Sequence, residues 1–235
     1  MPQMGMCTLS LRTKRVARLT CALSSRFKDF VSARPFPCVG AKSAMNRGRM
    51  EFAAFKELAD QSSAAELCDR LGAFSRAHPT PGSDTVSFVA MFRRPVANED
   101  EFHVKLWRHL QAMHDIDARS HPWDPSVSSS SDDKSFSFSI ASRAFFVVGL
   151  HPESSRMARR APFPCLVFNF HDQFEAMRAN GKYEMLQTAI RQRDVALQGD
   201  INPALARFGE GSEAAQYSGN VRMSGTGCPF HPRAA

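Results

Sequence analysis

The feature that most constrains the fold of this chain is a pair of apolar segments separated by only three residues. In residues 136–140, Phe and Ile alternate with Ser, whereas residues 144–150 form an unbroken apolar run. Alternation predicts a half-buried strand, and a short continuous run predicts a strand that is buried on both faces. The three-residue connection predicts that these two strands form a hairpin.

Other segments predict two more strands and several helices. Residues 85–92 alternate Val, Phe, Ala and Phe with other residues, and residues 165–170 form another continuous apolar run. Helices are expected over residues 45–58, 64–76, 98–117, 171–180 and 183–198. Helices and strands do not alternate as regular βαβ units, so we expect an α+β (mixed α/β) fold. It would contain a small central sheet with at least one hairpin, flanked by helices and wrapped by a C-terminal tail.

The beginning of the chain differs in composition from the rest. Residues 1–28 contain no acidic residue and six basic ones, namely Arg12, Lys14, Arg15, Arg18, Arg26 and Lys28. This composition is typical of a transit peptide, but the apolar core of a secretory signal is missing. We expect residues 1–28 to be a disordered basic extension or an over-long start. Residues 29–235 would form a single domain, since their number suffices for one compact core.

Several classes of protein are disfavoured by what the sequence lacks. The six cysteines are scattered without a CxxC pair, which favours reduced thiols in a cytoplasmic protein. No segment approaches the roughly 18 apolar residues that span a bilayer. The net charge of +7 would suit nucleic acid, but no pattern of a nucleic-acid-binding motif accompanies it, so we do not expect that partner. The HExxH and GxGxxG motifs are also missing.

A histidine and three arginines follow the buried run of residues 144–150 directly. His151 would lie at the rim of a hydrophobic layer, where a neutral imidazole can serve as an axial haem ligand. Arg156 and Arg160 follow within the same segment, and guanidinium groups match carboxylates such as haem propionates. The alternative is a loop histidine beside a solvated basic patch.

A second candidate site lies at the predicted start of the helix over residues 171–180. His171 and Glu175 would share one helix face, where they could hold a non-haem metal or form an acid–base pair. The alternative is a helix-start histidine followed by an exposed glutamate. The carboxylates that could bind a guanidinium through two hydrogen bonds are Asp194, Glu210 and Glu213. Each of them could instead be ordinary surface charge.

Two cysteines could also serve a cofactor. Cys38 could be a thiolate ligand, although a small buried apolar residue is the more common role of a free cysteine. Cys228 precedes Pro229, and this dipeptide resembles the Cys-Pro pairs that ligate ferric haem in some proteins. The alternative for Cys228 is a place in a structured tail.

Four stretches, at residues 37–48, 150–160, 164–175 and 190–230, together resemble the YqcI/YcgG family in their order and spacing. The resemblance extends over nearly the whole predicted domain. Characterised relatives are haem-dependent N-hydroxylases or N-oxygenases, some of which act on the guanidino group of arginine or of an arginine-derived cyclic amino acid.

The resemblance therefore implies a haem-dependent N-hydroxylase that contains haem b and uses O₂ as co-substrate. A reductase or a ferredoxin-like protein would supply electrons, and the substrate would be a small guanidino or amino compound. The protein would be cytoplasmic, without a membrane partner, and a homodimer is a possible assembly. The alternatives are a non-catalytic haem-binding or gas-sensing protein, and a non-haem metal enzyme.

The resemblance also suggests roles for individual residues. His151 would be the proximal ligand of the iron, with Arg156 and Arg160 near the propionates. His171 would be the second choice for the iron ligand, or a residue of the distal pocket. Glu175 or Glu213 would orient the cationic substrate.

Overall fold

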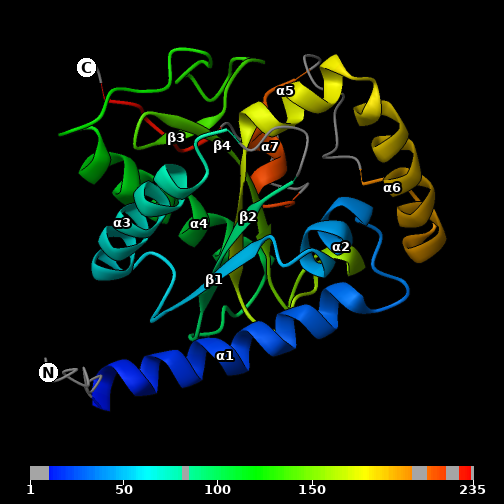
Figure 1. The fold of residues 1–235 in the computed structure, drawn as a ribbon, viewed down its shortest axis with the longest axis horizontal. Coiled ribbons are helices and arrows are strands. Elements are labelled where there is room, and N and C mark those ends of the chain that lie inside the picture. The colour runs from blue at the N-terminus through cyan, green and yellow to red at the C-terminus, as the bar shows by residue number, and fades with distance from the viewer. Residues whose placement is uncertain (1–10, 81–84, 203–210, 221–227, 234–235) are drawn as a thin grey trace, which may run out of the picture.

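A five-stranded sheet forms the centre of the protein in a computed structural model, which describes residues 11–80, 85–202, 211–220 and 228–233 (Figure 1). Its strands are β1 (Met50–Phe55), β2 (Ser87–Phe92), β3 (Phe138–Ile140), β4 (Arg143–Leu150) and β5 (Cys165–Phe170). The strand order is β1-β2-β5-β4-β3, with β1 and β2 parallel and the other neighbours antiparallel. The predicted mixed α+β class and the predicted hairpin, β3–β4, are confirmed.

Helices lie on both faces of this sheet. They are α1 (Leu11–Ser32), α2 (Val39–Asn46), α3 (Gln61–Ala77), α4 (Glu99–Asp117), α5 (His171–Ala179), α6 (Lys182–Gln198) and α7 (Ala214–Tyr217), with a short 3₁₀ helix, η1 (Met157–Arg159). Helices α3 and α4 cover one face, and α1 crosses the other (Figure 1). Within the described residues, none of the helices has the length and apolar character required to cross a membrane.

The two faces of the sheet carry two cores. The α4-side core contains Phe88 and Phe92 of β2, whereas the α1-side core contains Val89 and Met91 of the same strand. This division follows from the strand geometry, because successive side chains point to opposite faces. Every residue of β2 is buried, so the sheet forms the middle layer between two sets of helices.

The prediction that residues 1–28 form a disordered extension is wrong from Leu11 onward, because the residues from Leu11 form α1. Leu23, Phe27 and Val31 recur every four residues and are buried in the α1-side core. That spacing places them on one helix face, which packs on the sheet. Because the segment is basic overall, its composition gave no indication of this apolar stripe, which is part of the fold.

The prediction of a single helix over residues 45–58 is also wrong. Helix α2 ends at Asn46, Gly48 adopts a positive φ of 67°, and the chain then enters β1. Phe52 of β1 packs with the α1-side core, and Phe55 packs with the α4-side core. A strand with apolar residues on both faces has no clean alternation, so its two phenylalanines, three residues apart, mimic a helical spacing.

The described part of the C-terminal tail wraps the domain, as predicted. Beyond Phe145, β3 no longer pairs with β4. The Tyr217 hydroxyl accepts a hydrogen bond from the Phe138 N–H (3.0 Å) and donates one to the Phe145 carbonyl (3.2 Å). The buried Arg159 guanidinium donates to the carbonyls of Gly149 (3.1 Å) and Tyr217 (3.2 Å). The tail therefore satisfies backbone groups along an edge of β4.

Candidate functional site

The register of β4 and β5 separates the two predicted histidines. Phe145 pairs with Phe170, and Leu150 pairs with Cys165. His151 follows β4 and His171 follows β5, so they leave this antiparallel pair at opposite ends. Seven residues of strand at about 3.3 Å each put them roughly 20 Å apart. The expectation that His171 lines a distal pocket opposite an iron bound to His151 is therefore wrong.

His151 is enclosed on the α4 side of the sheet. Its ring stacks on Phe102 of α4, with 4.2 Å between ring centroids. Neither ring nitrogen has a hydrogen-bond partner among the described residues. Burial, together with the nearby Arg159 charge, lowers the pKa of His151 to about 4, so the imidazole is neutral at pH 7. The ring has the protonation state of a metal ligand, but its side chain is wholly buried.

Arg156 and Arg160, the arginines predicted to lie near haem propionates, have different environments. Arg156 is buried, donates to Asp194 of α6 (2.8 Å) and pairs with Asp200. These carboxylates of the same chain balance its charge, so the structure favours a role in fastening α6 over the expected contact with haem propionates. Arg160 is exposed and donates through Nε to the Ser154 carbonyl (2.7 Å). A propionate role for Arg160 stays a prediction.

Cys38 has its contact within its own segment. Cys38 is the N-cap of α2, where its sulfur accepts the Ala41 N–H at 3.4 Å. Burial raises the pKa of the Cys38 thiol, which therefore stays protonated at neutral pH. This geometry supports a capping role. The five described cysteines, Cys21, Cys38, Cys68, Cys165 and Cys228, are free.

Three predicted residues, His171, Glu175 and Glu213, lie in one region with Arg178, and we call these four residues the carboxylate end. His171 begins α5, and its Nε2 lies 3.3 Å from the Glu175 carboxylate one turn later. Arg178 pairs with the same carboxylate. Burial lowers the pKa of His171, and Glu175 acts against this shift. The arrangement confirms the shared helix face that was predicted for His171 and Glu175.

Glu213 reaches the carboxylate end from the tail, immediately before α7. Its side chain is 6% exposed, and its Oε2 has no hydrogen-bond partner among the described residues. Burial raises the pKa of Glu213 to about 7, against the opposing effects of Arg178 and Ser137. The group can therefore exchange a proton near neutral pH or accept hydrogen bonds from a cation. Of the other predicted carboxylates, Asp194 is bound to Arg156, and Glu210 lies outside the described residues.

Sequence reasoning missed Arg178 and the aromatic residues beside the carboxylate end. Arg178 lies three residues after Glu175 on α5, so helical spacing alone could have indicated it. Phe146 of β4 meets Phe174 of α5 and Tyr217 of the tail, each at 5.8 Å between ring centroids. These three rings come from distant parts of the chain, so local patterns carry no signal for their contact.

Helix α6 has an inner face that protein covers only in part. Asp194 is the one fully buried residue of this helix, whereas Leu186 and Ile190 are half-buried. Leu186 approaches Gly40 of α2, and Asp194 binds Arg156, so the face that carries these residues is turned toward α2 and the loop around η1. An apolar ligand could complete the burial of this inner face.

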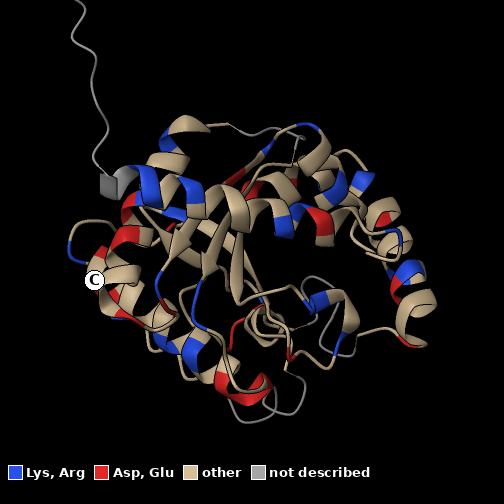
Figure 2. Cartoon of the chain, turned by 90° about the horizontal axis from the view of Figure 1, so that it is seen from below, with Lys and Arg blue, Asp and Glu red and all other residues tan. Residues whose placement is uncertain are grey.

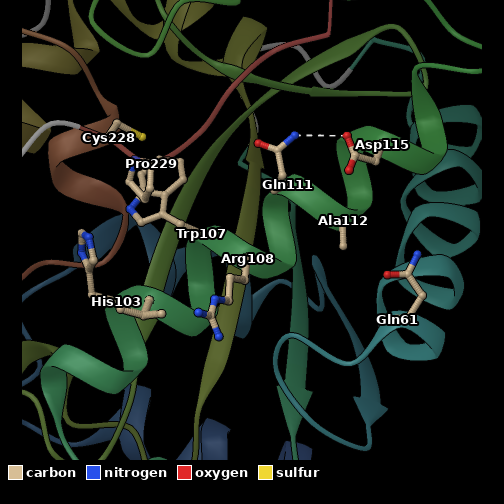
Figure 3. A pocket seen from close by; sticks show the side chains of 10 residues that line it. Gln61, His103, Trp107, Arg108, Gln111, Ala112, Asp115, Cys228 and Pro229 are labelled. Atoms are coloured by element: carbon tan, nitrogen blue, oxygen red, sulfur yellow. Dashed lines mark hydrogen bonds between the residues drawn. The ribbon is translucent and has the colours of Figure 1, made fainter.

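A separate pocket of about 600 Å³ lies between α4 and the end of the tail (Figure 3). It is lined by Gln61, His103, Val104, Trp107, Arg108, Gln111, Ala112, Asp115, Cys228 and Pro229. Burial raises the pKa of the Cys228 thiol, and His103 Nδ1 lies 2.8 Å from the Ser218 hydroxyl. None of the residues of the carboxylate end lines this pocket.

The described residues contain no group of three or more His, Cys, Asp or Glu side chains placed to hold a metal ion. A non-haem centre at His171 and Glu175 would therefore need a further ligand from elsewhere. A haem iron, by contrast, can be held by one histidine of the protein.

Comparison with known proteins identifies a family. No curated protein and no solved structure matches the chain. The pattern of the YqcI/YcgG family matches residues 27–231, from the last third of α1 to His231 in the tail. This range includes both histidines, the carboxylate end and all five strands. The chain therefore belongs to the YqcI/YcgG family.

Proposed function

We propose that this protein is a haem-dependent N-hydroxylase that uses O₂ and an electron donor to hydroxylate a guanidino or amino nitrogen of a small, arginine-like substrate. The observation that carries the proposal is the carboxylate end, where His171 lies beside Glu175 and the charges of Arg178 and Glu175 act on the buried Glu213, one oxygen of which has no partner among the described residues. The residue that we propose as iron ligand and the residue that we propose to bind the substrate cation thus lie in one region of the fold.

The donors at the carboxylate end fit haem. A metal-ligating histidine commonly gives its second ring N–H to a carboxylate, which fixes the tautomer and strengthens the ligand. The Glu175 carboxylate lies 3.3 Å from His171 Nε2, within reach of such a contact, and burial favours the neutral imidazole. We therefore propose His171, rather than His151, as the iron ligand. The stacking of His151 on Phe102 puts its ring on the α4 side, away from the inner face of α6.

The inner face of α6 supports the same location. Leu186 and Ile190 are half-buried apolar residues on a helix that follows α5 directly. On β4, Phe146 and Val148 are also only half-buried, although this strand lies within the sheet. A haem needs apolar walls of this kind, and completing their burial would stabilise its binding.

Each group of the carboxylate end would contribute separately to the reaction. A bound haem would supply the reducible iron at which O₂ is activated. Glu175 would hold the His171 ring, and Glu213 would accept hydrogen bonds from the guanidinium or ammonium group of the substrate. A cation beside Glu213 lowers the pKa of its carboxyl group, so substrate binding would favour the charged carboxylate. The Phe146, Phe174 and Tyr217 rings would keep water away.

We also propose a reducing compartment such as the cytoplasm. The five described cysteines are free, and Cys68 and Cys165 are buried thiols whose pKa values are raised by burial. Protonated, buried thiols of this kind are inert in a reducing environment.

Haem titration of a matched pair of variants tests the proposal. His171→Ala should lose the Soret band and its shift with carbon monoxide, whereas His151→Ala should retain both. The wild-type protein, supplied with a reductant and arginine, should form an N-hydroxy product detectable by mass spectrometry. If only His151→Ala lost the Soret band, the iron would instead be assigned to His151, at the opposite end of the β4–β5 pair. The absence of any band in wild type would refute the haem assignment, and a band without product would indicate a haem-binding or gas-sensing protein.

A further inference from the structure

The positive charge of the chain is concentrated in one layer of the fold. Residues 11–50, which form α1, α2 and the start of β1, contain ten of the 30 basic residues but only one of the 23 acidic residues, Asp29. The rest of the chain is therefore slightly acidic. Figure 2 views the molecule from the α1 side, and Lys and Arg recur along this helix.

Six of these basic side chains form a surface that we call the basic face. They are Lys14, Arg15, Arg18, Arg26, Lys28 and Arg34, and all six are exposed. None of them has a carboxylate partner among the described residues. Elsewhere basic residues are commonly paired, as Lys105 is with Glu101 and Arg143 is with Asp172. The basic face therefore presents a net field to solvent.

The basic face is held on a rigid support. Leu23, Phe27 and Val31 fix the opposite side of α1 to the sheet. Arg26 lies over the ring of Phe163 at 5.6 Å, and Lys28 lies over Phe52 at 5.3 Å. A helix whose apolar side is buried in a protein core cannot insert that side into a bilayer. This arrangement favours docking of a macromolecule on the charged side.

We propose that the basic face docks an acidic one-electron carrier protein, of the iron–sulfur or flavin class, which reduces the proposed haem site. The inference rests on the proposed function. Hydroxylation of one nitrogen inserts one oxygen atom of O₂ into an N–H bond and reduces the other atom to water. This balance consumes two electrons and two protons, and the carrier supplies the electrons one at a time.

The position of α2 connects the basic face to the proposed haem site. Helix α2 contacts α1 on one side and α6 on the other, where Gly40 lies against Leu186. A carrier seated on α2 and on the last turns of α1, which contact α2, would therefore stand next to the wall that includes the inner face of α6. Complementary charge would speed its encounter and orient it.

Charge reversal on α1 tests the docking. The α1 variant combines Arg15→Glu and Arg18→Glu in the helix with Arg34→Glu just after it, so it reverses three exposed charges, and within the helix Glu has nearly the propensity of Arg. The control reverses Arg108, Arg119 and Lys134, which are exposed in and after α4. With a reduced acidic [2Fe–2S] ferredoxin as the probe, the α1 variant should associate about tenfold more slowly or worse. The control should behave as wild type, and high salt should abolish the difference.

Failure of this inference can be distinguished from failure of the proposed function, because ferredoxin binding is measured without turnover. Equal association of wild type and the α1 variant would overturn the docking, even if dithionite still supports product formation. A DNA duplex or phosphatidylserine vesicles that bind wild type but not the α1 variant, with ferredoxin unaffected, would also overturn it in favour of another partner. Charge-dependent ferredoxin binding would support the docking even in a His171→Ala protein.

Discussion

Burial drives both Glu213 and His171 toward the neutral form, although it shifts their pKa values in opposite directions. The pKa of Glu213 rises to about 7, and the pKa of His171 falls. The carboxylate end is therefore less polar at neutral pH than its composition suggests. A cationic substrate would restore the charge of Glu213, so this residue is the side chain whose state we expect to depend most on ligand and pH.

The raised pKa of Glu213 predicts a pH dependence of stability. Between an ordinary value of 4.5 and about 7, the folded chain holds a proton at Glu213 that the unfolded chain has lost. Stability must then fall as pH rises through this window, by at most about 3 kcal/mol. In Glu213→Gln this contribution should disappear. Urea unfolding of both proteins at about pH 5 and pH 8 measures the difference.

Comparing wild type with Glu213→Gln separates the contribution of Glu213 to the pH dependence of stability from the contributions of the buried histidines. Those groups have lowered pKa values, so they make stability rise with pH and do so equally in both proteins. If wild type and Glu213→Gln lose the same stability between the two pH values, Glu213 is ionised in the folded protein at both, and its assigned environment is incorrect.

Single residues show what sequence could and could not reveal about the site. The i, i+4 spacing of His171 and Glu175 was sufficient to place them on one helix face. The burial of Glu213 beside them depends on a tail that returns more than thirty residues later, and no local pattern encodes that return. The separation of His151 from His171 depends on strand register, which is set by pairing between β4 and β5.

Among the helices, α6 is the one least supported by packing. Asp194 is its only fully buried residue, and Arg156 and Gln198 connect its last turns to the loop around η1. Since few apolar contacts hold this helix, the buried ion pair has a large share in its attachment.

Breaking that ion pair should loosen α6 before the sheet. Arg156→Gln would leave Asp194 buried without its partner, a change that costs about 3–5 kcal/mol in other proteins. We expect faster hydrogen exchange in the second half of α6, measured by mass spectrometry, with little change in β4 and β5. Arg160→Gln, which alters an exposed arginine four residues away, is the matched control.

The same variant tests the two readings of Arg156. If Arg156 fastens α6, its loss should change the exchange of this helix in the haem-free protein. If it instead binds propionates, α6 should remain protected while haem affinity falls. Unchanged exchange in α6 would contradict the fastening role.

Elements were predictable where the periodicity was unambiguous. The helix expected over residues 98–117 is α4, because Asn98 caps it and accepts the Glu101 N–H at 2.8 Å. The strands β4 and β5 likewise follow their continuous apolar runs. The errors concern β1, which is apolar on both faces, and α1, whose charged side concealed its apolar stripe.

At the scale of the whole molecule, the two cores share their strands. Each of β1, β2, β4 and β5 contributes alternate residues to the α4-side core and the α1-side core. If one core unfolded, the strands that it shares with the other core could not stay paired without exposing apolar side chains to water. We therefore expect both cores to unfold in one cooperative transition.

Phe27→Ala provides a sharp test of this cooperativity. Phe27 is 2% exposed in the α1-side core, and the tryptophans, Trp107 and Trp123, both pack on the α4 side. Truncation of a buried phenylalanine typically costs about 3–5 kcal/mol. If the cores are coupled, the urea midpoint from tryptophan fluorescence should fall as far as the midpoint from far-UV circular dichroism. Ser25→Ala, at an exposed position of the same helix, should leave both midpoints in place. A midpoint that falls by circular dichroism alone would show that α1 and its core unfold independently, and that the chain contains two stability units despite its single sheet.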